Sequence, residues 1–147
     1  GVTLMIKPHT RGGWKQSFTS NSALRKLANV HIADDDVHSA HLLAWADVII
    51  DLATSVAFEA IKAGKPVLAA DYLHAGRSAV ADYLPETALW CRDDIYQKID
   101  HFLTHGCGHF YNETHRRRFL REMIDGPDTD VLARYVQLLE ELTKQKR

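Results

Sequence analysis

Short apolar runs alternate along the chain with stretches whose apolar residues recur at helical spacing. The apolar runs predict strands at residues 2–6, 30–33, 47–52, 67–70 and 88–91. The helical patterns lie between them, at residues 22–28, 34–46, 55–63, 77–83 and 93–103, while the polar, Gly-containing stretch 10–22 predicts a loop. This alternation is typical of α/β domains with a parallel sheet. We therefore predict a Rossmann-like three-layer α/β domain with a mainly parallel sheet.

The last third of the chain predicts a helical tail. A Gly-containing break at residues 106–112 is followed by helical patterns at 113–124 and 130–144, with Gly126-Pro127 between them. There is no internal repeat and no low-complexity linker. We predict one sheet domain, residues 1–105, and a tail, residues 106–147, that packs on it.

The clearest local prediction is a β-α-β unit in the middle of the chain. The apolar run 48–50 suits a strand buried on both faces, and Thr54 or Ser55 supplies a helix N-cap. Gly64 stands where a left-handed cap ends the helix, just before the strand at 67–70. Such a unit has a right-handed crossover.

Composition and charge exclude some classes of protein. The 147 residues include 18 Lys and Arg against 19 Asp and Glu, for a net charge of −1, which argues against nucleic acid as the main partner. No apolar run approaches the roughly 18 residues that span a bilayer, and two cysteines are too few for a disulfide framework. We expect a soluble, cytoplasmic protein. Because a strand pattern begins at residue 2, we expect a domain cut from a longer protein, with a processed terminus as the alternative.

Two loops at the ends of predicted strands carry candidate chemistry, since ligands of open α/β sheets bind beyond the carboxyl ends of the strands. In the first, Thr54 and Ser55 open a helix whose N–H groups suit a phosphate, and Glu59 lies one turn on, on the same face as Ser55. These groups suit a nucleoside diphosphate and its ribose hydroxyls. The alternative is an ordinary cap with a solvated glutamate.

The second loop follows the first strand. In an extended chain Lys7, His9 and Arg11 point the same way, and all three can donate hydrogen bonds to phosphate. Gly12-Gly13 would let the backbone approach a ligand closely. The alternative here is a solvated basic loop.

Several of these segments resemble the carboxyl-terminal half of GT-B-fold glycosyltransferases, namely residues 46–51, 54–55, 58–60 and 64–68. Lys7-Pro8-His9 looks like the Lys/His-Pro loop of the same superfamily. The nearest group is that of the CDP-glycerol glycerophosphotransferases and capsule polysaccharide biosynthesis proteins, which often end in a basic, Phe-containing helix and an Asp-Gly turn. The tail resembles that pattern at residues 116–119 and 125–126.

The resemblance implies the donor-binding half of a transferase that moves a glycosyl or glycerol-phosphate group from a nucleotide-activated donor. It assigns donor phosphate to Thr54 and Ser55, ribose to Glu59, and the phosphate neighbourhood to His9 with Lys7 and Arg11. It implies a second Rossmann-like domain upstream, which would supply any general base, and a polysaccharide or lipid-linked acceptor bound between the two domains. It implies no metal and no cofactor, and an isolated chain that turns nothing over.

Two other functions remain open. UDP-N-acetylglucosamine 2-epimerases share the Glu-Ala…Gly-Lys-Pro-Val run, so a sugar-nucleotide epimerase would use the same cleft. A flavodoxin-like regulatory or scaffolding module would bind no nucleotide.

Other clusters have simpler explanations. His101 and His105, spaced to share a metal, are expected on an exposed helix face, and the acidic run 34–36 is expected to open a helix at the positive end of its dipole. The basic run 116–118, with Lys144, Lys146 and Arg147, is expected to be solvated. The alternative is contact with anionic lipid at the inner face of the membrane or with a polyanionic acceptor. Cys91 is expected to be buried and inert. Core or loop-anchoring positions are expected for Trp14, Trp45 and Trp90.

Overall fold

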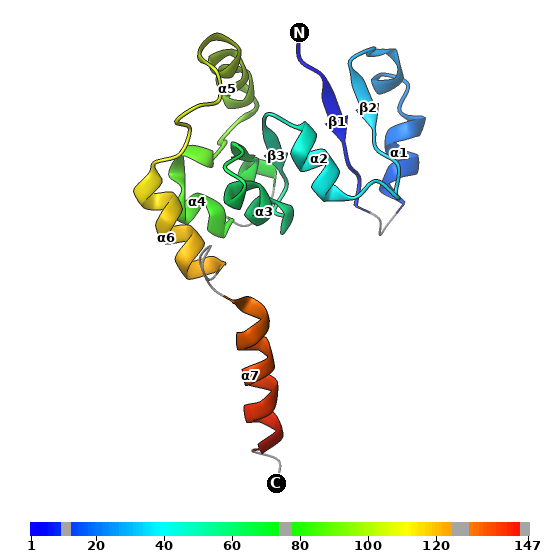
Figure 1. The fold of residues 1–147 in the computed structure, drawn as a ribbon. Coiled ribbons are helices and arrows are strands. Elements are labelled where there is room, and N and C mark those ends of the chain that lie inside the picture. The colour runs from blue at the N-terminus through cyan, green and yellow to red at the C-terminus, as the bar shows by residue number, and fades with distance from the viewer. Residues whose placement is uncertain (10–12, 74–77, 125–129, 145–147) are drawn as a thin grey trace. The chain divides into compact units, whose positions relative to one another are not determined.

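The computed structural model describes residues 1–9, 13–73, 78–124 and 130–144, and shows a mixed α/β protein (Figure 1). Its strands form two small parallel sheets, each of two strands. The chain divides into two compact units, residues 1–46 and 47–147, each of which is described by itself. The predicted division at residue 105 remains a prediction.

The first unit is built on a short parallel strand pair. β1 (Leu4–Ile6) lies beside β2 (Val30–Ile32), with Leu4 opposite Val30 and Ile6 opposite Ile32. The connection carries α1 (Trp14–Ser20) and a 3-10 helix (Leu24–Lys26), and α2 (Ser39–Trp45) follows β2. A parallel pair needs such a crossover, because its second strand must return to the starting end.

Two predictions for the first unit are wrong. The stretch predicted as a loop contains α1, which begins after Gly13 in the left-handed conformation (φ 69°). The acidic run does not open α2, which starts at Ser39 with the His38 ring accepting the amide hydrogen of Ala40. Asp34 instead pairs with Lys15 at 2.8 Å, so a lysine rather than a helix dipole compensates that carboxylate. This contact lowers the pKa of Asp34 and raises that of Lys15.

The second unit contains the predicted β-α-β element. β3 (Ile49–Asp51), α3 (Val56–Lys62) and β4 (Val67–Ala69) follow one another, and the two strands run parallel with Ile49 opposite Val67 and Asp51 opposite Ala69. A single parallel bridge joins Ala69 to Ala88. The remaining elements are the 3-10 helices Asp71–Leu73 and Pro85–Thr87, α4 (Ala79–Tyr83), α5 (Arg92–His105), α6 (Glu113–Met123) and α7 (Val131–Lys144).

The core of the second unit surrounds β4, which is buried along its whole length. Leu68, Ala70 and Leu89 pack with partly buried side chains of α5 and with Phe110. Phe119 of α6 is fully buried and lies against Phe58 and Tyr83, with ring centroids 5.5 and 5.7 Å apart. Burial of such side chains is the main favourable term in folding. Every described residue of α7, by contrast, is exposed.

Several expectations about burial are wrong. The strand predicted at residues 88–91 is reduced to the bridge at Ala88, and Cys91 is exposed. The reason is that the amide groups of Trp90 and Cys91 bond to the carboxylate of Asp94, at 2.6 and 3.2 Å, and so begin α5. β3 is not buried on both faces, since Ile50 is exposed. The tryptophans Trp14, Trp45 and Trp90 are exposed as well.

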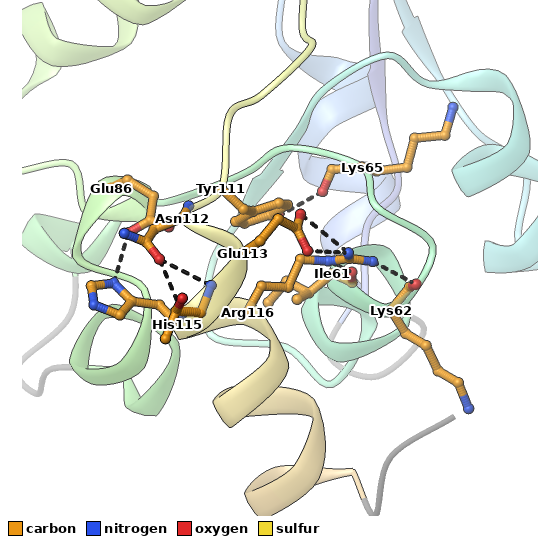
Figure 2. A network of polar contacts seen from close by, with 10 residues as sticks. Ile61, Lys62, Lys65, Glu86, Tyr111, Asn112, Glu113, His115 and Arg116 are labelled. Carbon is orange, nitrogen blue, oxygen red and sulfur yellow. Dashed lines mark hydrogen bonds and ion pairs between the residues drawn. The ribbon is translucent and has the colours of Figure 1, made fainter. Parts of the chain in front are cut away.

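Tyr111 and Arg116 fasten the start of the tail to the β-α-β element (Figure 2). The Tyr111 hydroxyl donates to the carbonyl of Lys65 (2.6 Å) and accepts from the amide of Val67 (3.0 Å). The Arg116 guanidinium donates to the carbonyls of Ile61 (2.9 Å) and Lys62 (3.1 Å). A cation at a helix C-terminus satisfies its last carbonyls and suits the negative end of its dipole. We call these contacts the tail clamp.

The predicted solvation of the basic run is wrong for Arg116, and the predicted left-handed conformation of Gly64 is confirmed. Arg116 is not solvated, whereas Arg118 bonds to Glu122 and lies over the Tyr83 ring, 5.1 Å from its centroid. Gly64 has the predicted left-handed conformation (φ 76°). A Cβ at Gly64 would stand 3.6 Å from the Arg116 side chain.

Replacement of Tyr111 by Phe is expected to destabilise the protein by about 1–3 kcal/mol, because it leaves the buried amide of Val67 and the carbonyl of Lys65 without their partner. Burial also raises the pKa of Tyr111 above the ordinary 10.0. A raised pKa means that the folded state favours the neutral phenol, so this stabilisation is complete below pH 10 and declines as the pH rises above it.

Urea unfolding followed by circular dichroism, from pH 7 to pH 11, measures both effects. The wild type should lose more stability above pH 10 than Tyr111→Phe does. Tyr96→Phe, at an exposed tyrosine of α5, is the matched control and should leave both stability and its pH dependence unchanged. Equal losses of stability above pH 10 in wild type and Tyr111→Phe would contradict the stabilising role of the Tyr111 hydroxyl.

Candidate ligand-binding site

The turn from β3 to α3 is held by a buried carboxylate. Asp51, the last residue of β3, is 5% exposed. It accepts the Thr54 hydroxyl at 2.6 Å and the Thr54 amide at 3.2 Å. Ala53 between them is left-handed (φ 58°), a conformation that costs a non-glycine residue energy and persists only where its surroundings impose it. The hydrogen bonds to Asp51 impose it here.

Ser55 follows this turn and does not cap α3, contrary to the sequence prediction. Its backbone is already helical (φ −66°, ψ −17°) and its side chain makes no capping bond. The first turn is closed instead by the backbone, where the amides of Ala57 and Phe58 donate to the carbonyls of Thr54 and Ser55. The Ser55 hydroxyl is exposed and has no partner among the described residues.

Glu59 lies one turn further along α3. It is exposed, and within the described parts of the chain its carboxylate makes no hydrogen bond or ion pair. The opposite side of α3 carries the buried Ala57, Ala60 and Ile61. Residues four apart share a helix face, so Ser55 and Glu59 lie together on the exposed side, about 6 Å apart along the axis.

A second buried carboxylate, Asp71, lies just beyond β4 and was missed by the sequence analysis. It is 8% exposed and accepts the amide and the hydroxyl of Ser78, at 3.1 and 3.4 Å. Ser78 in turn caps α4. The signal that could have found it is the repeated pattern of an aspartate at the end of an apolar run, as at Asp51. Both carboxylates hold the segments that leave the same end of the parallel strand pair.

The predicted basic loop belongs to the first unit. The Lys7 ammonium donates to the carbonyls of Asp34 and Asp35, at 2.7 and 3.1 Å, so Lys7 joins the segments that follow β1 and β2. His9 is exposed, and Arg11 lies outside the described residues. The expectation that these three side chains act together therefore stays a prediction. Their relation to Ser55 and Glu59, which belong to the second unit, stays a prediction too.

A polar hollow of about 180 Å³ lies elsewhere in the second unit, and none of the predicted site residues lines it. Its walls include the tail clamp residues Tyr111 and Arg116, together with Cys107 and His109. Burial is the main cause that raises the pKa of Cys107, so its thiol is protonated at neutral pH and is not an activated nucleophile. The hollow borders contacts that already hold the fold together.

The described residues contain no group of three or more His, Cys, Asp or Glu side chains arranged to hold a metal ion. The rings of His101 and His105 lie 4.7 Å apart, and both residues are exposed on α5 as predicted. No helix in the described parts of the chain is both long enough and apolar enough to cross a membrane. Comparisons with protein-family models, curated proteins and solved structures found no match to this chain.

Replacement of Asp51 by Ala tests whether its carboxylate holds the turn between β3 and α3. It leaves the Thr54 amide without its acceptor and releases Ala53 from its imposed conformation, so we expect a loss of about 1–3 kcal/mol in the free energy of unfolding. Urea unfolding gives the loss, and amide hydrogen exchange at Thr54 should accelerate.

Asp100→Ala is the control, because Asp100 is an exposed aspartate on α5. It should change neither measurement appreciably. Unchanged exchange at Thr54 in Asp51→Ala would show that the carboxylate does not hold the turn.

Proposed function

We propose that this chain is the donor-binding half of a GT-B-type glycosyltransferase, which transfers a glycosyl or glycerol-phosphate group to a polysaccharide or lipid-linked acceptor. The observation that carries the proposal is the pair formed by Ser55 and Glu59. Both side chains are exposed and lack a partner among the described residues, and both follow the carboxyl end of a parallel strand, where α/β proteins bind ligands. The motif resemblance supports the proposal from the sequence.

The chemistry of the pair suits the phosphates and the ribose of a nucleotide. The Ser55 hydroxyl can donate to a phosphate oxygen, and the Glu59 carboxylate can accept from ribose hydroxyls, as charge-assisted hydrogen bonds. Thr54 uses its hydroxyl hydrogen on Asp51, so in this proposal it positions Ser55 rather than donating to the phosphate. Stabilisation of the departing diphosphate is an electrostatic task that also calls for positive charge, which Lys7, His9 and Arg11 would supply.

The proposal extends to the rest of the enzyme. The chain would form a Rossmann-like three-layer domain with a mainly parallel sheet. A second Rossmann-like domain would bind the acceptor and supply any general base, and no metal or cofactor is needed. The reaction would take place in the cytoplasm, at the inner face of the membrane where the acceptor is lipid-linked.

Titration of the chain with UDP, CDP, GDP and ADP, followed by amide chemical shifts, tests the proposal. We expect shifts at Ser55, Val56 and Glu59 with at least one nucleotide. Ser55→Ala and Glu59→Gln should each weaken the affinity by about 10-fold. Ser55→Ala removes a hydrogen bond to a charged phosphate, and Glu59→Gln removes the charge that strengthens the hydrogen bonds from the ribose hydroxyls.

Glu140→Gln is the matched control, since Glu140 is an exposed glutamate on α7. Its affinity should equal that of the wild type. Absence of shifts with all four nucleotides at millimolar concentration would contradict the proposal for this chain and favour a scaffolding module. Conversion of a bound nucleotide sugar without an acceptor would indicate an epimerase instead.

A further inference from the structure

The helix α7 keeps a broad apolar face in solvent. It spans 14 residues, and every one of them is exposed. Large apolar residues recur along it at helical spacing and are between 47% and 74% exposed, namely Val131, Leu132, Tyr135, Val136, Leu138, Leu139 and Leu142. Such spacing gathers side chains on one side of a helix. We call these seven residues the apolar face of α7.

The apolar face needs a partner that the core of the second unit does not require. A helix of this length is marginal in water by itself, so α7 gains stability from whatever covers its apolar face. The core side chains Leu68, Leu89 and Phe119 are fully buried although every described residue of α7 is exposed. That core is therefore complete, and the apolar face is left to bind another surface.

The charges of α7 favour a protein partner over an anionic membrane. Helices that lie on anionic lipid have a polar side rich in Lys and Arg. In α7 the basic Arg134 and Lys144 are balanced by the acidic Glu140 and Glu141. The helix itself therefore carries no excess of positive charge to draw it to such a surface.

The apolar positions of α7 read the same in both directions from Gln137. At one, two and five residues on either side of it both residues are apolar, which gives the pairs Val136 and Leu138, Tyr135 and Leu139, and Leu132 and Leu142. A two-fold interface has this property, because contact of residue i with residue j of the other copy implies contact of j with i. The pattern therefore suits two copies of α7 laid antiparallel about Gln137.

The antiparallel direction also suits the sizes of the side chains. It places Tyr135, the largest side chain of the apolar face, against Leu139 of the other copy. A parallel pair in register would place the two tyrosines against each other. Cores pack well where large side chains face smaller ones, so the antiparallel pair is favoured.

The area of the apolar face is that of a small but specific interface. Full burial of one Val or Leu side chain removes roughly 60–120 Å² of apolar surface from water. The apolar face would thus bury on the order of 600 Å² on each copy. Specific protein interfaces bury roughly 600–1,000 Å² on each partner. We therefore expect a dimer that dissociates on dilution.

We propose that the apolar face of α7 binds the same face of a second copy of this chain, in an antiparallel helix pair whose two-fold axis passes beside Gln137. Leu132 of each copy packs against Leu142 of the other, and Tyr135 packs against Leu139. The pairing gives the tail of the chain a role in assembly. The inference goes beyond the proposed function and does not depend on it.

Sedimentation equilibrium of the whole chain, from micromolar to millimolar concentration, tests the proposal. The wild type should change from monomer to dimer over this range. Leu139→Glu should weaken the dimer by about 100-fold or more, because an unpaired carboxylate enters the two-fold interface twice. Leucine and glutamate are both good helix formers, so the loss reports on the interface. Unchanged amide shifts of Leu68 and Phe119 would confirm that the second unit of the variant is folded.

Ala133→Glu is the matched control, because it adds the same charge to the other side of α7. The Ala133 amide donates to the Asp130 carboxylate at 2.9 Å, and an acidic residue in the first turn suits the positive end of the helix dipole. The variant should dimerise as the wild type does. Equal weakening by Ala133→Glu and Leu139→Glu would contradict the apolar face as the interface.

The direction of the helix pair is tested with a mixture of isotope-labelled and unlabelled chains. Nuclear Overhauser contacts between the two kinds of chain report only on the interface. We expect contacts between the methyl groups of Leu132 and those of Leu142. Contacts between the Leu132 methyl groups of the two copies would indicate a parallel pair and overturn the antiparallel arrangement.

The other occupants of the apolar face are outcomes of the same experiments. A chain that stays monomeric at millimolar concentration would overturn the proposal. Protection of the α7 amides from exchange in that monomer would show that the same chain covers the apolar face. Binding to vesicles of phosphatidylcholine and phosphatidylglycerol, lost in Leu139→Glu, would show that a membrane covers it. A dimer that survives Leu139→Glu would also overturn the proposal, since it would use another surface.

Failure here is distinguishable from failure of the proposed function. Ser55 and Glu59 belong to the segment of α3, and no residue of α7 enters the proposed nucleotide site. Leu139→Glu should therefore leave the shifts caused by nucleotides unchanged, and Glu59→Gln should leave the dimer unchanged.

Discussion

The tail clamp is the contact on which the second unit depends. Tyr111 supplies both a donor and an acceptor to the turn after α3, and it does so from 44 residues beyond the amide of Val67 that it satisfies. Arg116 donates hydrogen bonds to two of the last carbonyls of α3 and so satisfies the end of that helix. Buried backbone groups that lack a partner are costly. The tail therefore completes the hydrogen bonding of the β-α-β element, and α6 folds with that element rather than as an appendage.

This dependence extends to the candidate site. α3 spans only seven residues, and a helix of that length is not stable in water by itself. It is fixed at both ends from outside, by the Asp51 turn at its beginning and by Arg116 at its end. Burial of Ala57, Ala60 and Ile61 fixes its rotation. The positions of Ser55 and Glu59 are thus set by contacts that do not involve their own side chains, and such support is what the proposed ligand site requires of a short helix.

The sequence predicted the parts of the fold that depend on local patterns. Gly64, the apolar run of β4 and the long pattern of α5 are short-range signals, and the parallel pairing of β3 with β4 follows from the α-helix between them. The errors arose where a distant or competing partner decided the outcome. Asp94 takes the amides of Trp90 and Cys91 and ends a predicted strand, while Lys15 engages an aspartate that was expected to open a helix.

The candidate site, like the fold, was predicted only where local geometry decides the arrangement. Ser55 and Glu59 lie on one exposed face as their spacing indicated, because that inference needs only the geometry of a helix. The capping role of Ser55 was wrong, since the carboxylate three residues before Thr54 organises the turn instead. Asp71 was missed although its place at the end of an apolar run, like that of Asp51, is a local signal. The exposed position of Trp90 was missed because its amide and that of Cys91 bond to Asp94 and end the predicted strand.

The left-handed Ala53 makes the turn before α3 a point at which stiffness can be engineered separately from ligand chemistry. Glycine at residue 53 would relieve a backbone conformation that costs other residues about 1–2 kcal/mol, and it would also leave the unfolded chain with more freedom to lose. A β-branched residue would increase the strain at this positive φ and would leave the unfolded chain with less freedom to lose. Variation at this one residue would therefore change the rigidity of the segment that carries Thr54 and Ser55 without altering any group proposed to contact a ligand.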